Sequence, residues 1–156
     1  MPTTDETDEQ VEEEFRSLLE GLRTTLPGVQ LVTAFLLTVP MYDKYESLVH
    51  AERVAYYFAF GSALVSSLLL MAPSSHQRLR SREGSVARHS RRHLDAAVKI
   101  TVVGSALFAL TITAVAYLVA SIVLSTHVAV IVSVVVAVAC LWSWYYLPLV
   151  SFRRDD

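Results

Sequence analysis

Long apolar stretches alternate with short polar ones along most of this chain. Apolar residues dominate at about 29–48, 54–72, 96–124 and 128–150, while most charged residues lie near the N-terminus, in two connecting segments and in the tail. A soluble helical protein spreads charges along every helix, whereas a membrane span needs about 20 mostly apolar residues. We therefore predict an all-α integral membrane protein in which residues 27–150 form a bundle of four transmembrane helices.

The N-terminal segment has a different pattern. Residues 11–26 place apolar side chains at helical spacing on one face and charged side chains on the others. Pro27 and Gly28 then predict a break before the first span, because proline disrupts a helix interior. We expect residues 1–26 to form an acidic tail and a separate amphipathic helix on the cytoplasmic side.

Residues 73–95 form a strongly basic segment between the two apolar halves. Its six arginines are Arg78, Arg80, Arg82, Arg88, Arg91 and Arg92. Short loops rich in Lys and Arg stay on the cytoplasmic side of the membrane. The tail, residues 151–156, contains two further arginines, so we expect both termini to be cytoplasmic in a plasma-membrane protein.

The same arginines have other interpretations. Basic clusters at a membrane surface attract anionic lipid headgroups, and they also suit an acidic protein partner. Nucleic-acid binding is not favoured, because the segment is short, has no interleaved aromatic residues, and belongs to a chain of net charge −2.

Small and polar residues recur at helical spacing inside the predicted spans. Ser62 and Ser66 lie in the second span, and Thr101, Ser105 and Thr113 lie in the third. Small residues permit close approach of two helices in a membrane, so helix packing is the favoured interpretation. The alternative is that these hydroxyl groups line a pore in an oligomer.

Candidate chemistry is sparse. The apolar cores of the predicted spans contain no Asp or Glu, although an ion-coupled transporter needs an ionisable group there. The single cysteine, Cys140, lies in an apolar run, and no catalytic, phosphate-binding or zinc-binding motif is present. We therefore expect no enzyme activity, no cofactor and no metal. Two alternatives are less favoured: a cation site formed by Asp43, Glu46, His50 and Glu52, and pH sensing by His76, His89 and His93 of the basic segment.

Three segments carry a resemblance to a known family. They are LRTTLPGVQLVTAFLLTVP at Leu22–Pro40, VAYYFAF at Val54–Phe60 and LLLMAPSSHQRL at Leu68–Leu79. They resemble small membrane proteins of unknown function that are common in actinobacteria, although here Gln77 separates His76 from Arg78. The resemblance implies four spans but no established chemistry. Some members are labelled sodium:proton antiporters, a label that is not favoured here because the apolar cores of the spans contain no Asp or Glu.

Two functional hypotheses follow. The first is a non-enzymatic membrane protein that assembles as a homo-oligomer, or binds a protein partner, through its cytoplasmic helix and basic segment. In this hypothesis the acidic face of residues 11–26 meets the basic segment of the same chain, or the same helix of a neighbouring subunit. The second is a small oligomeric ion channel, or a transporter linked to protons or cations.

Overall fold

The computed structural model describes residues 4–80 and 91–146, and within them the all-α prediction is confirmed. Four α-helices each contain a segment long and apolar enough to cross a membrane. The helices are α1 (Thr4–Thr38), α2 (His50–Arg80), α3 (Arg91–Val123) and α4 (Thr126–Leu141). Two short 3-10 helices, η1 (Val39–Met41) and η2 (Asp43–Tyr45), connect α1 to α2, and a π-helical turn, η3 (Trp142–Tyr146), follows α4.

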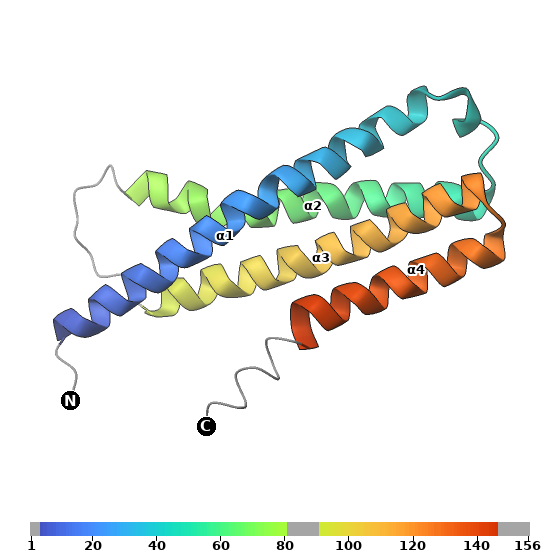
Figure 1. Ribbon diagram of the computed structural model, residues 1–156. Helices are drawn as coiled ribbons and strands as arrows, with labels where there is room; N and C mark the ends of the chain where they lie inside the picture. The colour runs from blue at the N-terminus through green and yellow to red at the C-terminus, as the bar shows by residue number, and fades with distance from the viewer. Residues whose placement is uncertain (1–3, 81–90, 147–156) are drawn as a thin grey trace.

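The helices run alternately in opposite directions along the bundle (Figure 1). Helix α2 packs along α3, α1 lies against both of them, and α4 contacts α3 but neither α1 nor α2. The connections from α1 to α2 and from α3 to α4 lie at one end of the bundle (Figure 1). The start of α1, the end of α2 and the start of α3 lie at the other end, which we call the basic end because Arg78 and Arg80 are in the last turn of α2 and Arg91 and Arg92 in the first turn of α3.

The predicted break at Pro27 is wrong, because α1 continues through it. Leu22 and Leu26 before the proline, and Val29 after it, belong to one apolar cluster that also includes Leu70 of α2. Both halves of α1 are therefore held on the same surface. Membrane helices tolerate proline because neighbouring helices, Ser or Thr side chains and small local adjustments of the helix satisfy the backbone groups that the proline leaves without a partner. The predicted amphipathic helix is thus the first half of α1.

Two other prolines mark the ends of the first two spans differently. Helix α1 ends at Thr38, two residues before Pro40, which lies in η1. This agrees with the rule that the residue before a proline is disfavoured in the α conformation. By contrast, α2 passes through Pro73 and continues to Arg80, so residues 73–80 are helical although we assigned them to a loop.

Side chains that face the interior recur at alternating spacings of three and four residues, which is the pattern of helices packed along a shared seam. On α2 they include Tyr56, Ala59, Ala63, Ser66, Leu70 and Pro73, with Ser62 beside them, and on α3 they include Leu94, Ala97, Gly104, Phe108, Thr111 and Leu118.

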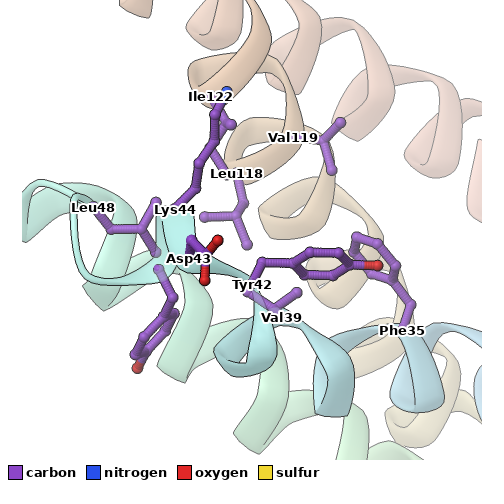
Figure 2. A pocket seen from close by; sticks show the side chains of 10 residues that line it. Phe35, Val39, Tyr42, Asp43, Lys44, Leu48, Leu118, Val119 and Ile122 are labelled. Atoms are coloured by element: carbon purple, nitrogen blue, oxygen red, sulfur yellow. The ribbon is translucent and has the colours of Figure 1, made fainter.

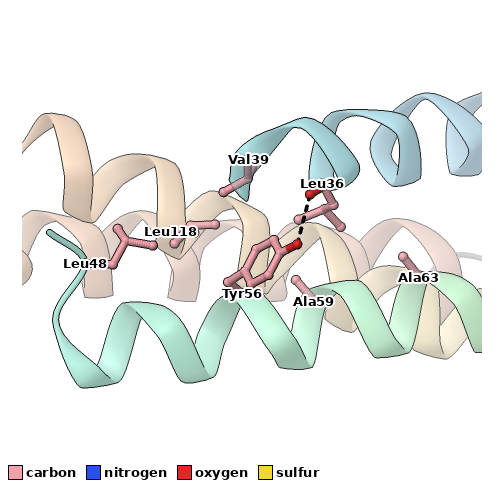
Figure 3. Packing of buried hydrophobic residues seen from close by; sticks show 7 residues of the cluster. All are labelled: Leu36, Val39, Leu48, Tyr56, Ala59, Ala63 and Leu118. Atoms are coloured by element: carbon pink, nitrogen blue, oxygen red, sulfur yellow. Dashed lines mark hydrogen bonds between the residues drawn. The ribbon is translucent and has the colours of Figure 1, made fainter. Parts of the chain in front are cut away.

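One core cluster lies near the end of the bundle opposite the basic end (Figure 3). There, Ala59 and Ala63 of α2 point toward α1, and their small side chains leave room for Leu36, which is fully buried. The hydroxyl group of Tyr56 donates a hydrogen bond of 3.2 Å to the backbone oxygen of Leu36. Small residues of α2 therefore permit close contact with α1 at this position.

Candidate functional site

The first candidate site is a pair of hydrogen-bonded contacts between α2 and α3. The hydroxyl oxygens of Ser62 and Thr111 are 2.8 Å apart, and the Ser66 hydroxyl donates a 2.8 Å hydrogen bond to the backbone oxygen of Gly104. All three side chains are buried, and Ser66 and Thr111 have no exposed surface. These hydroxyl groups therefore join two helices and do not face an open channel within the single chain.

Each hydroxyl group of the first contact also meets a carbonyl of its own helix. Ser62 lies 3.1 Å from the backbone oxygen of Ala59, and Thr111 lies 2.9 Å from that of Leu107. A hydroxyl group has one proton to donate and two lone pairs to accept with. If Thr111 donates to Leu107, Ser62 can donate to Thr111, so the pair satisfies its polar atoms without water.

Gly104 explains how closely the two helices approach. A Cβ atom at this position would lie 3.0 Å from Cγ and Cδ2 of Leu70 and 3.3 Å from Cβ of Leu69. Those distances are shorter than ordinary carbon contacts, so a side chain here requires the Leu70 and Leu69 side chains to give way by a few tenths of an ångström. The close approach brings the Gly104 carbonyl within reach of Ser66.

The three hydroxyl residues that we predicted on α3 are not the hydrogen-bond partners of Ser62 and Ser66. Thr101 donates to the backbone oxygen of Ala97, and Thr113 donates to that of Ala109, each at 2.9 Å. These two side chains and Ser105 are half-buried. The structure thus brings Ser62 and Ser66 of the predicted set into the α2–α3 contact, where their partners are Thr111 and Gly104. In the sequence, Gly104 and Thr111 are seven residues apart, which is the spacing of residues that lie on one contact face of two packed helices.

The Ser62–Thr111 contact can be tested by a double-mutant cycle with Ser62→Ala and Thr111→Val. Hydrogen bonds between membrane helices contribute about 0.6 kcal/mol on average and up to about 1.7 kcal/mol. We expect each single variant to lose about that much free energy of unfolding in bicelles, and the pair to lose less than the sum. Thr113→Val is the matched control, because its hydroxyl bonds within α3, and it should show no coupling to Ser62→Ala. Additive losses for Ser62 and Thr111 would contradict the contact.

The predicted contact site for lipids or a partner lies at the basic end. Arg82 and Arg88 lie outside the described residues. Arg78 and Arg80 belong to the last turn of α2, and Arg91 and Arg92 to the first turn of α3, and their side chains also lie outside the described part. The role of these six arginines therefore stays a prediction.

Tyrosines gather at the opposite end of the bundle. The Tyr45 hydroxyl donates a 3.2 Å hydrogen bond to the Tyr57 hydroxyl, and the ring of Tyr45 meets that of Tyr56 edge-on with centroids 5.5 Å apart. Glu52 accepts a 3.0 Å hydrogen bond from the backbone N–H of Val49, one residue before α2 begins. An acidic side chain at this position satisfies a free N–H group of the helix start. Glu52 therefore has a structural role at the start of α2.

The hydrogen bond to Tyr57 raises the pKa of Tyr45 above its ordinary value of 10.0, and partial desolvation adds to it. Because the folded protein favours protonated Tyr45, this stabilisation is complete below pH 10 and is lost as the pH rises through the raised pKa. We expect Tyr57→Phe to lower the pKa of Tyr45 in a tyrosinate absorbance titration, with Tyr45→Phe identifying the signal. An unchanged titration would contradict the hydrogen bond.

The same end also contains an apolar pocket of about 340 Å³ (Figure 2). Its walls come from the end of α1, the turn between α1 and α2, and the end of α3. Its apolar lining residues are Phe35, Val39, Leu48, Leu118, Val119 and Ile122, and Tyr42, Asp43, Lys44 and Tyr45 complete it. In residues 4–80 and 91–146, no group of three or more His, Cys, Asp or Glu side chains is placed to hold a metal ion.

Four helices long and apolar enough to cross a membrane, with buried hydroxyl groups of α2 and α3 bonded to one another between the helices, are characteristic of a multi-pass helical membrane protein. The chain belongs to the family of unknown function DUF6328, whose model matches residues 4–148. Comparison with curated proteins found no significant match, and neither did comparison with solved structures.

Proposed function

We propose that this chain is a non-enzymatic plasma-membrane protein that forms homo-oligomers, or binds a protein partner, through the first half of α1 and the basic segment 73–95. The observation that supports this most is the continuity of α1. With 35 residues, α1 is about 52 Å long, whereas the hydrocarbon of a bilayer is about 30 Å thick. The first half of α1 therefore extends beyond the membrane as part of one rigid helix.

The exposed face of this extension is mainly acidic. Leu19, Leu22 and Leu26 pack toward the cluster formed with α2 and α3. The exposed charged residues of the same half are Glu13, Glu14, Arg16, Glu20 and Arg23. An acidic helix beside a basic segment gives each chain two complementary surfaces, and a second copy can pair its acidic helix with the basic segment of the first. Electrostatic pairing of this kind weakens as salt rises.

The proposed orientation follows from the arginines. The start of α1, the end of α2 and the start of α3 lie at the same end of the bundle (Figure 1). Short arginine-rich loops stay in the cytoplasm, so this orientation places the acidic half of α1, the basic segment and both termini in the cytoplasm. Anionic headgroups of the inner leaflet are a further partner for the arginines at this surface.

The experiment is native mass spectrometry of the full chain in nanodiscs, with charge reversal on both surfaces. We expect Glu13, Glu14 and Glu20 changed together to Lys to shift oligomers toward monomers, and Arg88, Arg91 and Arg92 changed to Glu to restore them. Asp43 and Glu46 changed to Lys is the matched control at the other end of the bundle. A monomeric wild type that recovers no membrane partner by crosslinking would overturn the proposal.

The alternative is an oligomeric channel, and it needs hydroxyl groups that are free to line a conduit. Ser62 and Ser66 are engaged between α2 and α3, while Ser105 and Thr113 are half-buried. Ion flux into liposomes that disappears when Ser105 and Thr113 are replaced by Leu would favour the channel. The absence of flux from a defined oligomer would favour the assembly role.

A further inference from the structure

The pocket at the end of the bundle opposite the basic end has an apolar interior with charges beside it (Figure 2). Phe35, Val39, Leu118, Val119 and Ile122 supply apolar walls, and Asp43 and Lys44 are adjacent residues of η2. In Figure 2 the Lys44 side chain extends toward Ile122, and the Asp43 carboxylate lies beside it. A site of this kind suits a molecule with an apolar tail and a charged head.

The position of the pocket indicates where its occupant comes from. Val119 and Phe35 line the pocket and yet have 43% and 42% of their surface exposed on helices that cross the membrane. The pocket therefore opens sideways between α1 and α3 into the surrounding lipid, and Tyr42 marks the interfacial level where aromatic side chains gather. A volume of about 340 Å³ is at the lower end of ligand sites. It suits a segment of one acyl chain and is too small for both chains of a phospholipid.

The charges of Asp43 and Lys44 indicate which kind of lipid headgroup suits the pocket. Within the described residues, neither Asp43 nor Lys44 has an opposite charge within ion-pair distance, so both are available to a ligand. An ammonium group at Lys44 suits a phosphate, and a carboxylate at Asp43 suits a cation that donates hydrogen bonds. The phosphate and primary ammonium of an ethanolamine headgroup offer both groups a short distance apart. Choline has no N–H to donate, and a glycerol headgroup has no cation.

We propose that this pocket binds one acyl chain of an ethanolamine phospholipid, with the lipid phosphate at Lys44 and its ammonium group at Asp43. The site lies at the opposite end of the molecule from the surfaces used in the proposed assembly, and the two proposals stand independently. A lipid bound here holds the end of α1 against the end of α3.

The test is native mass spectrometry of the full chain taken from nanodiscs of equal parts phosphatidylethanolamine, phosphatidylcholine and phosphatidylglycerol. We expect one retained phosphatidylethanolamine per chain, enriched roughly fivefold over phosphatidylcholine, which corresponds to about 1 kcal/mol for an exposed charged contact. Asp43→Asn should abolish this preference, and Lys44→Gln should reduce total retention. Glu46→Gln is the matched control, because Glu46 lies one residue beyond η2 and does not line the pocket.

The apolar part is tested by Val119→Trp, which fills the pocket, against Val123→Trp, one turn further along α3, outside the lining and 71% exposed. Only the first should lose the lipid, with circular dichroism showing that both fold. A phosphatidylethanolamine carrying a diazirine in its acyl chain should label residues 118–122 of the wild type, a measurement that needs no variant. Equal retention of the three lipids, equal retention by the two tryptophan variants, or crosslinks between two copies at Val119 would overturn the proposal.

Discussion

Gly104→Leu is expected to separate α2 from α3 and to cause a large loss of stability. A Cβ atom alone would lie 3.0 Å from Cγ and Cδ2 of Leu70, and a leucine adds three further carbon atoms in the same direction. Overpacking by a few carbon atoms costs about 1–3 kcal/mol and more when the backbone must move. The displacement would also remove the hydrogen bond from Ser66 to the Gly104 carbonyl.

The smaller substitution Gly104→Ala shows how the opposing effects compare. Alanine gains up to about 1 kcal/mol of helix propensity over glycine, while overpacking costs about 1–3 kcal/mol, so we expect a modest net loss. Gly61→Ala on α2 is the matched control, because nothing lies within 4 Å of a Cβ atom there, and it should stabilise the protein. Reversible unfolding in bicelles measures both. Equal effects of the two substitutions would show that α2 and α3 are not in close contact at Gly104.

A second variant should locate the steric conflict. Leu70→Ala removes the side-chain atoms that a Cβ at position 104 would meet. On its own it creates a cavity and costs about 2–5 kcal/mol, since Leu70 is fully buried. The double variant Gly104→Ala with Leu70→Ala should lose less than the sum of the two single losses. Strict additivity would mean that the cost at Gly104 arises elsewhere.

Leu36→Ala is expected to give the second large effect, a loss of about 2–4 kcal/mol in the free energy of unfolding. Leu36 is fully buried among Tyr56, Ala59 and Ala63, so truncation leaves unfilled space between α1 and α2. In a membrane the loss comes from missing packing contacts, because lipid is as apolar as leucine. The next residue is the control, since Leu37 is 55% exposed and Leu37→Ala should cost less than about 1 kcal/mol. A similar loss for both would contradict the packing of α1 on α2.

The sequence was informative about which segments are apolar and less informative about which faces meet. Four spanning helices followed directly from hydropathy, because each span must satisfy its backbone polar groups internally. The continuity of α1 through Pro27 could not be predicted locally. It depends on Leu22 and Val29 packing into the same cluster with residues of α2 and α3, and such tertiary contacts cannot be read from the local sequence.

The candidate site was predicted in part for a geometric reason. On α2, Ser62 and Ser66 were identified and do face α3. On α3, a strict interval of four residues selected Thr101, Ser105 and Thr113, but a seam follows alternating intervals of three and four, so the chosen set leaves the contact face. Gly104 and Thr111 lie on that face. The pocket, formed by residues from α1, the turn and α3, has no local signal in the sequence.

Helix α3 is the only described α-helix that contacts the other three, and this has a consequence for biosynthesis. Membrane helices insert first and associate afterwards, and the ribosome delivers them in order from the N-terminus. When α1 and α2 have been made, the Ser62 and Ser66 hydroxyls still lack their partners on α3. The arrival of α3 completes both contacts. Helix α4 arrives last and packs on α3, where Ala129 is fully buried and the ring of Trp144 stacks on that of Phe108, so the last span covers a contact between α2 and α3 that its predecessors can already form.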